Sequence, residues 1–222
     1  MANTNVKQAI EAPGISMDDL LFGDIPLDTW ASMGTDVAPW NLFAKAKDFK
    51  DAGNMNAVIK TIREIIDLEN LESRQYLQAY NVLHEYDVPV PGEIELFGII
   101  VQVGMPDGLD QLAVYADLST RYYNYSGKMI IWEHPDDSLD KQIEEILETG
   151  KGMLNLMGPW NDKKPAAPGN GYARINFLTS HGLHFGQAAI NDLFNDPNAA
   201  PIMNKMLELM KTLIDKNNNT VL

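Results

Sequence analysis

Two hydrophobic periods divide the chain, and the change between them falls near Pro91. Between residues 39 and 90, apolar residues recur every three to four positions, which is the spacing of helices that bury one face. Asn54 can cap the second of these helices. That helix carries one apolar stripe, formed by Val58, Ile59, Ile62, Ile65 and Ile66. With a third helix over residues 71–86, the pattern predicts a three-helix cap at residues 39–90.

The first two helices of this cap contain a second pattern. Ala46, Phe49, Gly53 and Val58 follow a small-aromatic-small spacing, which resembles one helix hairpin of a tetratricopeptide-type repeat. Repeat arrays need about three units to bury a continuous core, and no second copy follows at a period of about 34 residues. A helical cap on the next domain is therefore preferred over a peptide-binding array.

After Pro91 the apolar residues alternate with polar ones, as they do in strands with one buried face. Four such stretches follow in order: IELFGIIVQVGM, QLAVYAD, TRYYNY and KMIIWE. The sequences PDGLD, LS and SG separate them as turns, which predicts an antiparallel meander. In this pattern Ser126–Gly127 is a two-residue hairpin loop.

The remaining residues add two helices and a second hairpin. An acidic turn at residues 138–140 begins a helix that ends near Met157, and a Pro/Gly-rich loop follows, GPWNDKKPAAPGNGYA. ARINFLT and LHFGQA form the hairpin, and PIMNKMLELMKTLIDK is a closing amphipathic helix. Residues 91–222 are thus predicted to be an α+β body, with helices packed on an antiparallel sheet of a four-strand meander and a hairpin.

Residues 1–38 have a different character. They hold six acidic residues and one lysine, a net charge of −5 by that count, and show little periodicity. We predict a loosely ordered acidic arm, although the apolar clusters at residues 20–22 and 25–30 indicate that part of it packs on the body or on a partner.

Composition and charge exclude several kinds of partner and chemistry. The chain contains 17 Lys and Arg against 31 Asp and Glu, a formal charge of −14, and its four arginines are scattered, so nucleic acid and anionic membranes are poor partners. There are no cysteines, which excludes disulfides, thiolate metal sites and cysteine nucleophiles. No signal-peptide pattern and no apolar run of about 18 residues occur, so we expect a cytoplasmic protein.

Several segments resemble a bacterial protein family to which no function is assigned. They are GLDQLAVYAD, TRYYNYSGK, IIWE, GPW and RINFLT, and the likeness covers most of the chain after residue 40. The resemblance implies no activity, cofactor or substrate. At the last hairpin the family is associated with small turn residues, whereas this chain has His181 between Ser180 and Gly182, so the resemblance implies no catalytic role for that histidine.

One candidate binding face lies on the third predicted strand. Alternation places Arg121, Tyr123 and Tyr125 on one side and Tyr122 on the other. Tyrosine offers an apolar ring with a polar tip and arginine a planar fork of donors, which suit an interface or a small polar ligand. The alternative is that these side chains only stabilise the meander through cross-strand contacts. We expect Arg121 at the surface and Tyr122 buried, because arginine is rarely buried without a partner.

An alternative site is formed by Glu133, His134 and His184, which could supply a histidine and a carboxylate to a hydrolase-like enzyme. The sequences of a nucleophile elbow, a P-loop, a dinucleotide-binding loop and a zinc-protease helix do not occur. We therefore expect neither a metal nor a cofactor.

Two functions follow from these patterns. The first is a non-enzymatic module that binds an unknown protein or small molecule, with self-association into a homo-oligomer as one form of it. The second is the small-molecule enzyme. A cleft holding a desolvated carboxylate or histidine favours the enzyme, whereas an exposed apolar face favours the module.

Overall fold

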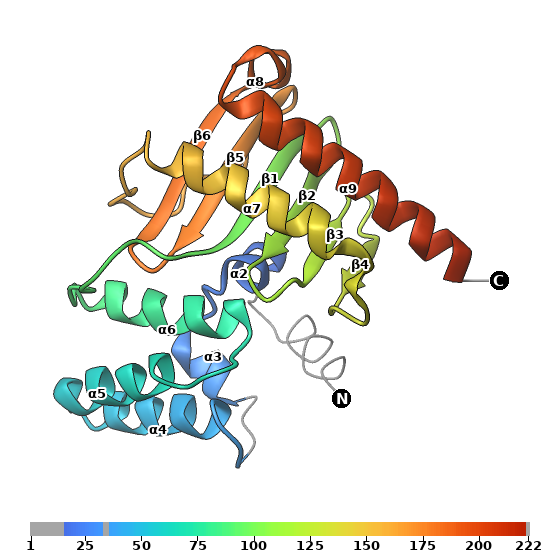
Figure 1. Cartoon of the computed structure of the whole chain (residues 1–222). Coiled ribbons are helices and arrows are strands. Elements are labelled where there is room, and N and C mark those ends of the chain that lie inside the picture. The colour runs from blue at the N-terminus through green and yellow to red at the C-terminus, as the bar shows by residue number, and fades with distance from the viewer. Residues whose placement is uncertain (1–15, 33–35, 221–222) are drawn as a thin grey trace. The chain divides into compact units, whose positions relative to one another are not determined.

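The computed structural model describes residues 16–32 and 36–220 of the chain. The chain divides into two compact units, residues 1–94 and residues 95–222 (Figure 1). Each unit has its own hydrophobic core.

The first unit is helical. Its helices are α2 (Met17–Phe22), α3 (Leu27–Ser32), α4 (Trp40–Asp51), α5 (Met55–Ile66) and α6 (Ser73–Glu85). The helices α4, α5 and α6 occupy the three stretches that the helical periodicity predicts. Asn54 caps α5 as expected, since its side chain accepts a hydrogen bond from the Ala57 amide at 3.2 Å. The predicted stripe of α5 packs into the core, with Val58, Ile62 and Ile65 fully buried.

Residues 16–32, which the sequence placed in a loosely ordered arm, form two helices instead. Ser16 and Asp19 make a reciprocal capping box that begins α2. Between the two helices, the backbone of Ile25 exchanges two hydrogen bonds with the side chain of Gln78, at 2.8 and 2.9 Å. Because Leu20, Ile25 and Leu27 join the helical core, their burial outweighs the acidic composition of the segment. Residues 1–15 and 33–35 of the predicted arm lie outside the described residues.

The second unit is built on a six-stranded antiparallel sheet with the strand order β4-β3-β2-β1-β5-β6. The strands are β1 (Leu96–Met105), β2 (Gly108–Tyr115), β3 (Thr120–Tyr123), β4 (Met129–Trp132), β5 (Tyr172–Thr179) and β6 (Gly182–Ala189). The first four form the predicted meander, and β5 and β6 form the predicted hairpin, which pairs with β1. The α+β fold class is therefore confirmed.

Helices cover one face of this sheet (Figure 1). They are α7 (Asp140–Leu154), preceded by the short 3-10 helix η1 (Asp137–Leu139), then α8 (Ile190–Asn195) and α9 (Ala199–Thr220). The core between sheet and helices includes Ile99, Phe177, Ile143 and Leu209, all fully buried. The sequence pattern did not predict α8, which follows β6 directly. No helix within the described ranges is both long and apolar enough to cross a membrane.

The hairpin between β3 and β4 has a longer loop than predicted. The Asn124 amide donates to the Lys128 carbonyl at 2.9 Å, and the Gly127 amide donates to the Asn124 carbonyl at 2.9 Å. The loop therefore contains Tyr125 as well as Ser126 and Gly127. Gly127 has a φ of 82°, which fits a type I turn followed by a left-handed residue.

A long segment without regular structure, residues 155–171, joins α7 to β5 and is held by specific contacts. The guanidinium group of Arg174 donates to the carbonyl oxygens of Pro165 and Ala166, at 3.2 and 2.5 Å. The Gly171 amide donates to the carbonyl of Gly104 at 3.2 Å, which anchors the end of the segment to β1. The Pro/Gly-rich segment is therefore tied to the sheet at several points.

Candidate functional site

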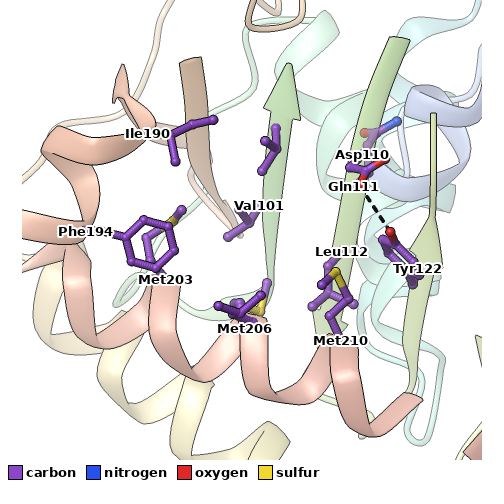
Figure 2. A pocket seen from close by; sticks show the side chains of 12 residues that line it. Val101, Asp110, Gln111, Leu112, Tyr122, Ile190, Phe194, Met203, Met206 and Met210 are labelled. Carbon is purple, nitrogen blue, oxygen red and sulfur yellow. Dashed lines mark hydrogen bonds between the residues drawn. The ribbon is translucent and has the colours of Figure 1, made fainter. Parts of the chain in front are cut away.

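A cavity of about 270 Å³ lies in the second unit, between the sheet and the helices α8 and α9. Figure 2 shows side chains of the strands facing those of the helices across it. The sheet contributes Val101, Val103, Asp110, Gln111, Leu112 and Tyr122, and the helices contribute Ile190, Phe194, Met203, Met206, Leu207 and Met210. Its volume is close to the lower end of the range of about 300–1,000 Å³ for small-molecule pockets.

The helical wall of the cavity is rich in methionine. Met203, Met206 and Met210 follow one another along α9 at spacings of three and four, so they share the face turned toward the sheet. Methionine is flexible and polarisable, and it adapts to apolar molecules of different shape. Leu207 at the rim is 36% exposed. The cavity wall is thus apolar and adaptable, with a partly exposed rim.

One charged side chain interrupts this apolar lining. Asp110 lies on β2 two residues before Leu112, so the strand alternation turns it toward the helices. Its carboxylate accepts a hydrogen bond from the hydroxyl of Tyr122 at 3.1 Å (Figure 2). It also accepts one from the backbone amide of Tyr125 at 2.7 Å. The two bonds hold the carboxylate in a fixed position at the cavity wall.

Tyr122 is buried as the alternation predicted, and only 9% of it is exposed. Burial, the nearby charge of Asp110 and the hydrogen bond to Asp110 raise the pKa of Tyr122 to about 12. The phenol is therefore protonated at neutral pH and acts as a hydrogen-bond donor to the carboxylate.

The predicted binding face of Arg121, Tyr123 and Tyr125 is not continuous. Arg121 is 2% exposed, which corrects the expectation that it lies at the surface. Glu133 forms an ion pair with its guanidinium group, and the ring of Tyr115 lies 5.5 Å from it, so the buried charge is compensated. Tyr123 is half-buried at the end of β3, and Tyr125 is exposed in the hairpin loop beyond the strand.

The alternative site residues Glu133, His134 and His184 do not come together. Glu133 pairs with Arg121, while His134 Nε2 lies 3.0 Å from Asp140 Oδ1. Both follow β4 at one edge of the sheet, whereas His184 lies on β6 at the other edge. Four strands separate them, so no histidine–carboxylate pair forms between His184 and Glu133. Among the described residues, no three His, Asp or Glu side chains are grouped to hold a metal ion.

His184 is nevertheless unusual, because it is fully buried on the helix-covered face of β6. Its Nδ1 lies 3.3 Å from the carbonyl oxygen of Met157, and its Nε2 is buried without a hydrogen-bond partner. Burial lowers the pKa of His184 below its ordinary value of 6.5, the carbonyl of Met157 opposes this shift, and the charge of His181 adds to it. The imidazole is therefore neutral in the folded protein at neutral pH.

This burial predicts a loss of stability in acid. Below about pH 6.5 the unfolded chain binds a proton at His184 that the folded chain does not, so the free energy of unfolding falls as the pH drops toward the lower folded pKa. We expect urea unfolding of His184→Gln to show a smaller decrease in stability between about pH 7.5 and about pH 5 than the unchanged protein. His181→Gln, at the adjacent turn, should retain most of the decrease. An equal pH dependence for His184→Gln and the unchanged protein would contradict the prediction.

Asp110 was not among the predicted site residues, because the sequence PDGLD was assigned to a turn. Aspartate is disfavoured in strands, so the propensity pointed to a longer turn. In the structure β2 begins at Gly108, and Asp110 pairs with Val103 of β1. The alternation of the strand could have identified it. Asp110, Leu112 and Val114 are two residues apart and share one face of the sheet, where a carboxylate interrupts an otherwise apolar row.

Comparison of the chain with models of protein families, with curated proteins and with solved structures finds no match. The likeness to a bacterial family therefore remains a resemblance between short segments.

Proposed function

We propose that residues 95–222 form a non-enzymatic module that binds a small, mostly apolar molecule in the cavity between the sheet and the helices α8 and α9. The observation that carries this proposal is the cavity itself, an apolar space of about 270 Å³ with one fixed polar pair in its wall. Ligand sites in proteins combine a predominantly apolar lining with a few placed polar groups, and this cavity has that composition.

The size of the cavity limits the affinity. It is larger than the engineered apolar cavity of about 150 Å³ that takes benzene, so it suits a molecule of about ten non-hydrogen atoms. At about 0.4–0.6 kcal/mol per atom, such a ligand gains about 4–6 kcal/mol, which corresponds to a Kd between about 1 mM and 40 μM.

The separation of the candidate catalytic residues supports the module over the enzyme. His184 and Glu133 lie at opposite edges of the sheet, and neither lines the cavity. Binding of a protein partner and assembly into a homo-oligomer remain predictions from the sequence.

A titration with 1-hexanol tests the proposal. The side chains of Met203, Met206 and Met210 line the cavity, so their ¹³C-methyl NMR signals report binding at the site. We expect saturable shifts of these three methyl signals in the unchanged protein. In Val103→Trp the added ring should occupy the cavity, so the ligand loses the space that it fills. We expect the apparent affinity for 1-hexanol to fall at least about tenfold.

Ile131→Trp is the matched control. Ile131 lies on β4 and pairs with Arg121, so it is on the sheet face opposite to Tyr122 and the cavity. This variant should bind 1-hexanol as the unchanged protein does. Methionine methyl signals that do not move with 1-hexanol, or that move equally in Val103→Trp, would refute the proposed function.

A further inference from the structure

We infer that the cavity selects positively charged amphiphiles, with the hydrocarbon part against the methionines of α9 and an ammonium group on the carboxylate of Asp110. This inference rests on the proposed function and adds the chemical class of the ligand. It is carried by the charge of Asp110, its place in the lining and its hydrogen-bond partners.

Asp110 has acceptor capacity to spare. An ionised carboxylate offers about four lone-pair sites, and the two partners of Asp110 are the hydroxyl of Tyr122 and the amide of Tyr125. Both are neutral donors. Within residues 16–32 and 36–220, no lysine, arginine or histidine forms an ion pair with this carboxylate. The site therefore presents a negative charge that a bound cation can compensate.

The surroundings of Asp110 strengthen this preference. The lining next to it is apolar, so an ion pair formed there is less screened than one in water. The hydroxyl of Tyr122 also has lone pairs that can accept a second hydrogen bond, while its proton is directed to Asp110. A primary ammonium carries three donors, so it can donate to the carboxylate of Asp110 and to the hydroxyl oxygen of Tyr122 at once.

The same geometry disfavours an anionic ligand. A carboxylate head at this wall would face the charge of Asp110, and both anions would lose water. The formal charge of −14 on the whole chain adds a long-range attraction for cations and a repulsion for anions. A neutral alcohol should lie between these two cases.

Three probes with one tail and different heads test the inference: hexylammonium, 1-hexanol and hexanoate, each titrated at about pH 7 and followed by the methionine methyl signals. We expect hexylammonium to bind about tenfold more tightly than 1-hexanol, as a charge-assisted hydrogen bond predicts, and hexanoate to bind most weakly. Equal affinity for hexylammonium and 1-hexanol would overturn the inference and leave the proposed function standing. If none of the three probes shifts the methionine methyl signals, both the inference and the proposed function are refuted.

Two variants test which residue causes the preference for an ammonium group. Asp110→Asn removes the charge and keeps an oxygen that accepts from the Tyr125 amide, so hexylammonium and 1-hexanol should bind this variant with similar affinity. Tyr122→Phe removes the hydroxyl and keeps the carboxylate, so the advantage of hexylammonium should become smaller but should exceed that in Asp110→Asn. An unchanged preference in Asp110→Asn would overturn the assignment to this residue. The probe comparison on the unchanged protein decides the inference even where a variant fails to fold.

Discussion

Replacing Tyr122 by alanine is expected to lower the free energy of unfolding of the second unit by about 3–5 kcal/mol. The ring belongs to the buried core between the sheet and the helices, and it lines the cavity. Truncation therefore enlarges an existing space that the surrounding side chains already fail to fill. It also removes the hydroxyl donor from the carboxylate of Asp110. Urea unfolding combined with hydrogen exchange of β1 and β5 amides would measure the loss in this unit.

Tyr123→Ala is the matched control, because the neighbouring residue carries the same side chain on the opposite face of the sheet. Tyr123 is half-buried and lies opposite Gln111 and Met129 in the register. Its truncation should mainly remove cross-strand contacts, worth about 0.2–1 kcal/mol each. A larger loss of stability for Tyr123→Ala than for Tyr122→Ala would contradict the assignment of Tyr122 to the core.

Gly104→Ala is expected to displace the segment 155–171 and to cost about 3 kcal/mol, the upper end for overpacking. A Cβ atom at this position would overlap the carbonyl groups of Gly169 and Pro168. Both are backbone groups, so no side-chain rotation can make room. Limited proteolysis should cut the displaced segment faster, and the fluorescence of Trp160 should change.

Gly152→Ala tests whether the effect comes from this close approach. Gly152 lies in α7, and a Cβ atom there meets no other atom within 4 Å. Since alanine favours a helix over glycine, this variant should be neutral or more stable by up to about 1 kcal/mol. Equal proteolysis of the segment in both variants would show that the contact between Gly104 and Gly169 does not hold it.

The architecture of the second unit could be predicted because its local patterns agree with its packing. Alternating runs gave the positions of β1 to β6, and the helical periods gave α7 and α9. The loop between β3 and β4 was predicted too short, since the Ser-Gly pair marks a turn without showing that Tyr125 belongs to it.

The site could not be predicted, because it depends on contacts between distant parts of the chain. Arg121 looks like a surface residue by type, yet Glu133, twelve residues later, compensates its buried charge. The cavity exists because α9 does not fill the space next to Val101 and Leu112. The methionine spacing predicts an inward face of the helix, but it contains no information about how closely that face meets the sheet.

The segment 155–171 also lies against one edge of the sheet. β6 ends the sheet, and the outer backbone groups of such a strand can pair with a strand of another chain (Figure 1). The amide of Trp160 donates to the carbonyl of Leu183 in β6 at 2.7 Å, and the indole packs edge-on against Phe185 with ring centroids 5.0 Å apart. The segment thus covers part of this edge. Because Arg174 holds this segment in place, we expect it also to limit the pairing of β6 with a strand of another chain.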